Sequence, residues 1–143
     1  MPTIFSRIIS GELPGRFVWR DSSVVAFLSI EPMRPGHVLV VPRAELDHWI
    51  DLDADLAGHL FVVAQQIGRA QRLEWNPLRV GVLIVGEEVP HVHIHVVPIN
   101  TVGELSFANI DRSPTPEALD DAAERLRTRL RELGHAEEAD AAQ

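Results

Sequence analysis

Residues 91–98 of the chain alternate three histidines with aliphatic residues and end at a proline: His-Val-His-Ile-His-Val-Val-Pro. In a β-strand, successive side chains point to opposite faces of the sheet, so the three imidazoles share one face and the aliphatic side chains share the other. The aliphatic face has to be buried in a core. The segment therefore predicts an internal strand with His91, His93 and His95 in a row on its second face, with roughly 6.5–7 Å between successive Cα positions of the row.

Hydrophobic periodicity predicts the other elements of secondary structure. Between residues 53 and 73, apolar side chains recur at every third or fourth position, which indicates a long amphipathic helix. A short helical turn is expected within residues 4–13. Four further strands are predicted from β-rich segments at 17–20, 24–28, 37–42 and 78–86. Because helices and strands follow one another without regular βαβ alternation, we expect an α+β fold with an antiparallel sheet.

The last third of the chain is expected to add a helix to the same domain. Residues 111–134 predict a C-terminal helix that packs on residues 1–110, with Thr115 as N-cap and Pro116 as the first helical residue. The arginines of this helix are interleaved with acidic residues, which is typical of a solvated helix face. The acidic tail, residues 135–143, is expected to be disordered.

Composition and charge exclude several functional classes. The 143-residue chain has no cysteine, which rules out disulfides, thiolate metal sites and cysteine nucleophiles. Its formal net charge of −8 argues against a nucleic-acid polymer as partner, since phosphate contacts need a basic face, although a small phosphorylated ligand needs only a local pocket. No apolar run is long enough to predict a membrane span, and no signal peptide is evident. We therefore expect a cytoplasmic, single-domain protein.

Three interpretations of the histidine row are open. A zinc ion could bind two of its members together with His37, Glu87 or Glu88, but three histidines in line cannot all reach one ion, because Zn–N bonds are only about 2.0–2.1 Å long. The row could also be a solvated face without function. The third interpretation is nucleophilic catalysis, because a neutral imidazole with a pKa of about 6.5 can attack phosphorus and form a covalent intermediate. Only this interpretation uses all three imidazoles, with His93 between the other two.

The segment Val-Gly-Glu-Glu-Val-Pro-His-Val-His-Ile-His-Val-Val-Pro, residues 85–98, resembles the signature of the histidine-triad (HIT) superfamily, His-φ-His-φ-His-φ-φ with φ apolar. The resemblance covers residues 3–100 and includes Pro-x-x-x-Gly-His-x-φ-φ-φ-Pro at residues 32–42. It implies a HIT domain over residues 1–110, with a five-stranded antiparallel sheet and one long and one short helix. It also implies a homodimer, formed through the long helix and a sheet edge, that binds nucleotides and cleaves or transfers nucleoside monophosphates at the α-phosphate.

The same resemblance implies roles for the histidines. His93 resembles the nucleophile that forms a nucleotidyl-histidine, and His95 resembles the residue that contacts the phosphate and assists the leaving group. His91 and His37 resemble the two residues that complete the imidazole cluster. No cofactor and no catalytic metal ion are implied.

Several substrate-binding positions depart from the family pattern. Ile30, with Phe27 nearby, falls where the family packs the base, and Ser29 replaces a ribose-binding aspartate without its charged, bidentate geometry. Glu87 replaces a glutamine, and Glu88 stands where a small hydroxyl residue is common. Two ionised carboxylates beside a phosphate would repel it. At least one of the two glutamates therefore points away from the phosphate, carries a proton, acts as acid or base, or pairs with a cationic leaving group. In the simplest alternative, both side chains are solvated in the turn.

Three further replacements concern a structural zinc site that some members of the superfamily carry. Thr3 and Ser6 replace its paired cysteines and Glu45 replaces its histidine, so no structural zinc is expected. Three functional hypotheses follow. The first is a phosphoramidase- or dinucleoside-polyphosphate-hydrolase-like enzyme acting on a purine nucleotide or nucleotide conjugate. The second is a nucleotide-binding or sensing module with negligible turnover, and the third is a metal-dependent hydrolase that uses the histidines with Glu87 or Glu88.

Overall fold

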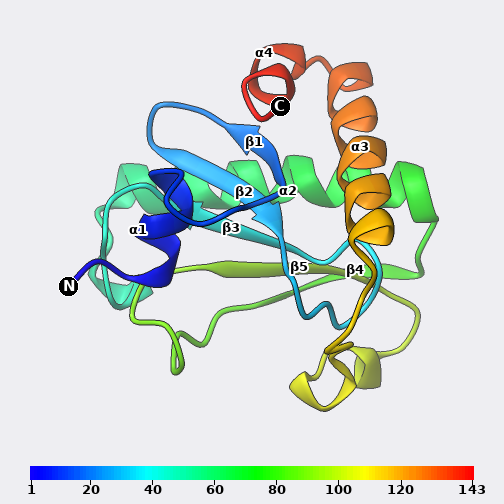
Figure 1. Ribbon diagram of the computed structural model, residues 1–143, viewed down its shortest axis with the longest axis horizontal. Coiled ribbons are helices and arrows are strands. Elements are labelled where there is room, and N and C mark those ends of the chain that lie inside the picture. Colours follow the sequence, from blue (N-terminus) through cyan, green and yellow to red (C-terminus); the bar gives the residue numbers. More distant parts are fainter.

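The computed structural model describes residues 1–143 and contains a five-stranded antiparallel sheet in the order β1-β2-β3-β5-β4 (Figure 1). The strands are β1 (Phe17–Arg20), β2 (Val24–Leu28), β3 (Val38–Pro42), β4 (Arg79–Leu83) and β5 (Ile94–Ile99). The helices are α1 (Ile4–Ile9), α2 (Ala54–Trp75), α3 (Pro116–Glu132) and α4 (Ala136–Asp140), with short 3-10 helices η1 (Trp49–Asp51), η2 (Val102–Glu104) and η3 (Phe107–Asn109). The predicted α+β fold with five antiparallel strands is confirmed. No helix combines the length and the apolar composition needed to cross a membrane.

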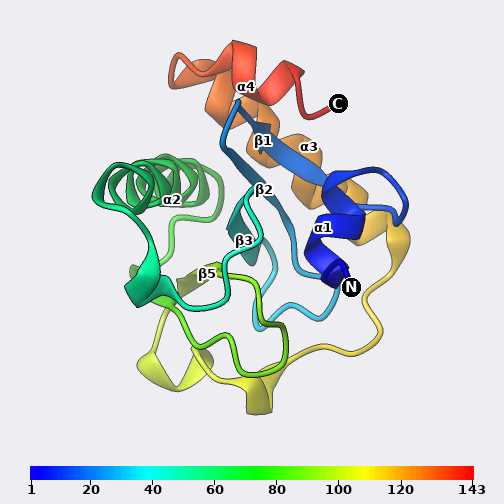
Figure 2. The same cartoon turned by 90° about the vertical axis from the view of Figure 1, so that its left-hand side faces the viewer.

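The sheet lies between two layers of helices. Side chains of α2 and α3 pack into the core on one face, and α1 lies against the other. Figure 2 shows α2, viewed along its axis, and α1 on opposite sides of the sheet. The residues of β2 alternate accordingly. Val24, Ala26 and Leu28 belong to the large core beneath α2 and α3, whereas Val25 and Phe27 pack on the α1 side. Alternate side chains of β2 thus pack into two different apolar layers.

A buried glutamine of α2 bonds to the backbone of β5 and to the backbone just before β3. The side-chain nitrogen of Gln71 donates to the carbonyl oxygens of Gly36 and Val96, each 2.9 Å away. Gly36 immediately precedes His37, and Val96 immediately follows His95. Helix α2 therefore holds the backbone next to two of the histidines, although it lies on the opposite face of the sheet from their rings.

The C-terminal region agrees only in part with the sequence prediction. Helix α3 begins after the N-cap Thr115, as expected, and packs on α2 and on strands β1 and β2. The tail at 135–143 is not disordered, which corrects the expectation: Ala136–Asp140 forms α4, and Ala139 is fully buried. A helix this short is stabilised by packing rather than by its own propensity, and α4 contacts α3 and β1.

Candidate active site

Four histidines meet on the α1 side of the sheet. His37 precedes β3, His91 and His93 precede β5, and His95 lies within β5. The ring centroids of His93 and His95 are 4.9 Å apart, and those of His37 and His95 are 5.2 Å apart. None of the four is more than 7% exposed. The structure thus brings together the four histidines that the sequence analysis singled out.

The histidine row does not lie entirely within a strand, which corrects the prediction for residues 91–98. Strand β5 begins only at Ile94, and the backbone N–H of Val92 donates to the carbonyl of Leu46, 2.8 Å away in the loop after β3. The alternation is nevertheless kept. Val92, Ile94 and Val96 belong to the core beneath α2 and α3. The imidazoles lie on the other face, where those of His91 and His93 pack against Phe5 of α1.

Hydrogen bonds determine which nitrogens of His37 and His95 carry a proton. The backbone N–H of Met33 donates to Nδ1 of His37 at 3.0 Å, so this nitrogen has no proton in the neutral ring. The proton of His37 is therefore on Nε2, which donates to Nδ1 of His95 at 2.9 Å. Neutral His95 must then carry its own proton on Nε2. Because no protein group bonds to that nitrogen, His95 offers a free N–H donor.

His93 is held in the opposite tautomer. Its Nδ1 lies 2.7 Å from the carbonyl oxygen of His91, which can only accept, so Nδ1 carries the proton and Nε2 carries a lone pair. In His91, Nε2 lies 2.8 Å from the carbonyl oxygen of Pro42 and Nδ1 lies 2.7 Å from Oγ1 of Thr3. Both ring nitrogens of His91 are thus occupied, whereas Nε2 of His93 is free to attack.

Burial keeps the cluster uncharged near neutral pH. Loss of hydration, followed by repulsion from neighbouring imidazolium charge, lowers the pKa of His37 to about 3 and the pKa of His95 to about 4. Burial is also the main cause that lowers the pKa values of His91 and His93. A neutral imidazole keeps its lone pair, so the lone pair on Nε2 of His93 is available at pH 7.

Two phenylalanines that the sequence analysis did not identify flank the cluster. Phe5 of α1 lies edge-on to His93 with 4.8 Å between ring centroids, and Phe107 of η3 lies edge-on to His95 at 5.4 Å. Phe5 is buried, whereas Phe107 is half exposed. The 3-10 helices of residues 102–109 therefore form one rim of the site, in a segment whose sequence has no regular periodicity.

The predicted base- and ribose-binding residues lie at three different depths. Ile30 is 68% exposed, and Ser29 is half-buried, with its hydroxyl oxygen accepting from the backbone N–H of Glu31 at 3.2 Å. Phe27 is only 3% exposed and packs edge-on against Phe5. It supports the wall of the site from within the core.

The side chains of the cluster do not form the zinc site considered from the sequence. Glu87 and Glu88 are exposed in the connection between β4 and β5, as expected for a solvated turn. No group of three or more histidine, aspartate or glutamate side chains is arranged to hold a metal ion. Within the cluster, only Nε2 of His93 and Nε2 of His95 lack protein partners, whereas a catalytic zinc ion ordinarily takes three protein ligands.

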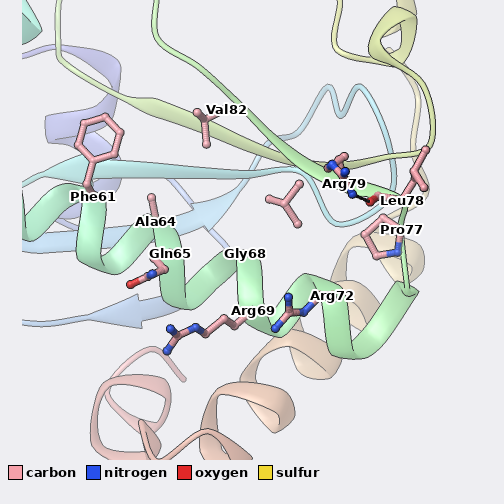
Figure 3. Close-up of a pocket in the computed structure, with 11 residues that line it drawn as sticks. Phe61, Ala64, Gln65, Gly68, Arg69, Arg72, Pro77, Leu78, Arg79 and Val82 are labelled. Carbon is pink, nitrogen blue, oxygen red and sulfur yellow. Dashed lines mark hydrogen bonds between the residues drawn. The ribbon is translucent and has the colours of Figure 1, made fainter.

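The structure has one cavity beside the imidazole cluster and another that lies apart from it. A groove of about 610 Å³ between α2 and β4 contains none of the histidines (Figure 3). The groove is lined by apolar residues, including Phe61, Leu78 and Val82, and by Arg69, Arg72 and Arg79. A second cavity, of about 360 Å³, is lined by Ser29 and His37 together with the start of α3. Its volume is within the usual range for small-molecule sites.

Comparison with known proteins agrees with this geometry. A model of the HIT domain matches residues 10–102. Protein hit of Bacillus subtilis (strain 168) is 34% identical over 100 residues, which cover 66% of this chain and 69% of that protein. The purine nucleoside phosphoramidase of Escherichia coli (strain K12) is 33% identical over 113 residues, which cover 72% and 92%. The crystal structure of a zinc-bound histidine triad family protein from Mycobacterium smegmatis aligns with a TM-score of 0.78 at 28% identity, over 93% of this chain and 96% of that chain.

Proposed function

Because the chain belongs to the HIT domain family, we propose that it cleaves a nucleoside monophosphate conjugate at the α-phosphate through a covalent nucleotidyl intermediate on His93. The observation that supports this most strongly is the pair of opposite tautomers. His93 presents a free lone pair on Nε2, and the neighbouring His95 presents a free N–H donor on Nε2. One ring is thus prepared to attack phosphorus and the other to stabilise the negative charge that develops.

The first chemical step forms one bond and breaks another. Nε2 of His93 attacks the α-phosphorus, and the bond from phosphorus to the leaving group breaks. An amine leaving group departs with a proton taken up from solvent, while the Nε2–H of His95 stabilises the charge on the departing atom or on a phosphoryl oxygen. His93 becomes a phosphorylated imidazolium. Its Nδ1–H remains bonded to the carbonyl of His91, and this hydrogen bond strengthens because the donor is now charged.

The second step restores the enzyme. Water attacks the phosphorus of the intermediate and loses a proton to solvent, which replaces the proton taken up in the first step. The bond from phosphorus to His93 breaks, and the nucleoside monophosphate leaves as the imidazole becomes neutral again. Burial lowers the pKa of His93, which makes the neutral imidazole a better leaving group in this step and keeps its lone pair unprotonated for the first step. The cycle consumes one water molecule and uses no metal ion.

We assign a purine nucleoside to the substrate. The name of the Escherichia coli relative, a purine nucleoside phosphoramidase, supports this assignment. Ile30 offers an exposed apolar surface for the base, and the Ser29 hydroxyl, which accepts from the backbone of Glu31, retains its proton for a ribose oxygen. The expected cytoplasmic setting is consistent with a free nucleotide conjugate as substrate.

A fluorogenic AMP phosphoramidate tests this proposal. Wild-type protein, untreated and chelator-treated, should release the fluorophore at equal rates, and His93→Ala should lower kcat by about 1,000-fold or more. The control is His48→Ala, which replaces an exposed histidine outside the cluster and should leave kcat unchanged. Activity that chelation abolishes would instead identify a metal-dependent hydrolase. Tight AMP binding without release would identify a binding or sensing module.

We also propose that two copies of the chain pair through the groove between α2 and β4. Strand β4 is at the edge of the sheet, so its outer backbone groups have no strand partner. Phe61, Leu78 and Val82 are each about half exposed or more along this face (Figure 3). Val82→Glu should convert a dimer to a monomer in light scattering, whereas Val102→Glu, a matched change at an exposed valine of η2, should not. A wild-type monomer at micromolar concentration would contradict this pairing.

A further inference from the structure

The N-terminal helix is bonded to the imidazole cluster by a short network of polar side chains. Thr3 is the N-cap of α1 and accepts from the backbone N–H of Ser6 at 3.1 Å. The same hydroxyl lies 2.7 Å from Nδ1 of His91, 88 residues away in the sequence. Glu45, in the loop after β3, accepts both from the backbone N–H of Thr3 and from the hydroxyl of Ser6, each at 2.7 Å. The first of these bonds is the main cause that lowers the pKa of Glu45.

The direction of each hydrogen bond in the network follows from what its neighbours can accept. Nε2 of His91 must donate to the carbonyl of Pro42, so Nδ1 of the neutral ring is an acceptor. The single proton of the Thr3 hydroxyl goes to this nitrogen at 2.7 Å rather than to the hydroxyl of Ser6 at 3.3 Å. The Ser6 proton in turn goes to Glu45. Each hydrogen bond of the network therefore has one defined donor and one defined acceptor, and His91 has one defined tautomer.

This arrangement controls the orientation of His93 through the backbone. The carbonyl of His91 is the acceptor for Nδ1–H of His93 at 2.7 Å. A His91 ring held at both nitrogens limits rotation of its own residue and therefore of that carbonyl. The same network holds α1 in place, and Phe5 of α1 packs edge-on to both rings, at 5.8 Å from His91 and 4.8 Å from His93.

The donor set does not fit a zinc ion. Three of the four side chains occupy positions where the family resemblance puts zinc-binding cysteines and a histidine, but Thr3 and Ser6 offer neutral hydroxyls instead of thiolates. Nδ1 of His91 and the oxygens of Thr3, Ser6 and Glu45 are already bonded to one another. A hydrogen-bonded network therefore stands where a metal would otherwise join α1 to the histidines.

We propose that Thr3 is a positioning residue for His93, acting through its hydrogen bond to His91 and held in place by Glu45. This inference rests on the proposed role of His93 as nucleophile. Thr3 itself does not touch the reacting atoms. Removing its hydroxyl leaves Nδ1 of the fully buried His91 without a donor, so the ring can turn and the His91 carbonyl loses its fixed direction. His93 then samples both tautomers, and only one of them has a free Nε2 lone pair.

The test combines kinetics with ¹⁵N spectra of the histidine rings. In Thr3→Val, kcat for the AMP phosphoramidate should fall by about 10- to 100-fold with KM changed little, because the nucleophile is misplaced while the binding surface is intact. The spectra should show one tautomer of His93 in wild type, with the proton on Nδ1, and a mixture in the variant. Thr3→Ser keeps the hydroxyl and should restore both the spectra and most of kcat.

Thr128→Val is the matched control, because it makes the same change at an exposed threonine of α3, which covers the opposite face of the sheet from the imidazoles. It should leave kcat and the His93 spectrum unchanged. If Thr3→Val does not fold, Glu45→Ala, a change at an exposed residue, should give the same mixed tautomers to a smaller extent. Wild-type spectra and kcat in Thr3→Val, or a Thr3→Ser variant as impaired as Thr3→Val, would overturn the proposal. If wild type releases no fluorophore, the proposed function fails, and the substrate-free spectra still decide the role of Thr3.

Discussion

Acidification should destabilise this protein well above the pH range in which carboxyl groups titrate, because its fold buries neutral imidazoles. The perturbation is a shift from about pH 7.5 to about pH 5. His37 and His95 are almost fully buried and stay neutral in the folded protein over this range, since their pKa values are about 3 and about 4. In the unfolded chain a histidine has a pKa of about 6.5 and is protonated at pH 5.

The sign and size of the effect follow from proton linkage. Below pH 6.5 the unfolded chain binds more protons than the folded protein, so the free energy of unfolding falls as pH falls; above pH 6.5 the contribution is fully present. Each such histidine contributes about 1.4 kcal/mol per pH unit, so His37 and His95 together remove roughly 4 kcal/mol between pH 6.5 and pH 5. This is a large share of the stability of an ordinary domain, about 5–15 kcal/mol.

Urea unfolding at the two pH values, followed by tryptophan fluorescence, measures this loss directly. Trp19 is buried and reports on the core. The double variant His37→Gln/His95→Gln should lose much less stability on acidification, whereas His48→Gln, which leaves the cluster intact, should lose as much as wild type. The reasoning is refuted if wild type keeps its unfolding free energy within about 1 kcal/mol at pH 5, or if the double variant shows the full loss.

Three smaller predictions concern other positions of the chain. Gly36→Ala should lower the free energy of unfolding, measured by urea denaturation, by about 2–4 kcal/mol. Gly36 has φ +87°, and a Cβ at this position would collide with the Trp75 ring. A decrease below about 0.5 kcal/mol would contradict this packing. Glu87→Gln with Glu88→Gln should tighten AMP binding by up to about fivefold at low salt and less at high salt, because two solvated negative charges are removed near the phosphate; calorimetry showing no change at low salt would place both side chains away from the ligand. Phe107→Ala should raise the pKa of His95 toward its ordinary value, since burial is the main cause that lowers it; an NMR titration with an unchanged His95 pKa would show that the phenyl ring does not contribute to that burial.

Local patterns were sufficient to predict much of the fold. The long helix α2 and the helix α3 with its N-cap Thr115 follow from apolar periodicity and capping residues, and the strands follow from β-rich segments between turns. The prediction that His37 lies close to the other three histidines came from the family resemblance rather than from periodicity. Its basis in the structure is the pairing of β3 with β5, which puts Leu39 opposite His95.

The remaining features depend on contacts between distant segments. Strand β5 starts later than predicted because Val92 bonds to Leu46 in a loop rather than to a neighbouring strand. Helix α4 forms because Ala139 reaches the core, which a polar, alanine-rich tail does not reveal by itself. The tautomers of the histidines depend on single backbone atoms, such as the N–H of Met33. The network at Thr3 joins this residue to His91, 88 residues away in the sequence.

The most direct test of the central claim is the intact mass of the protein quenched within the first turnover of an AMP phosphoramidate. Attack by Nε2 of His93 predicts a transient protein species heavier by one adenylyl group, with the label on the peptide that contains His93, and no such species in His93→Ala. Product release without any labelled protein, or a label on a residue other than His93, would contradict the covalent mechanism.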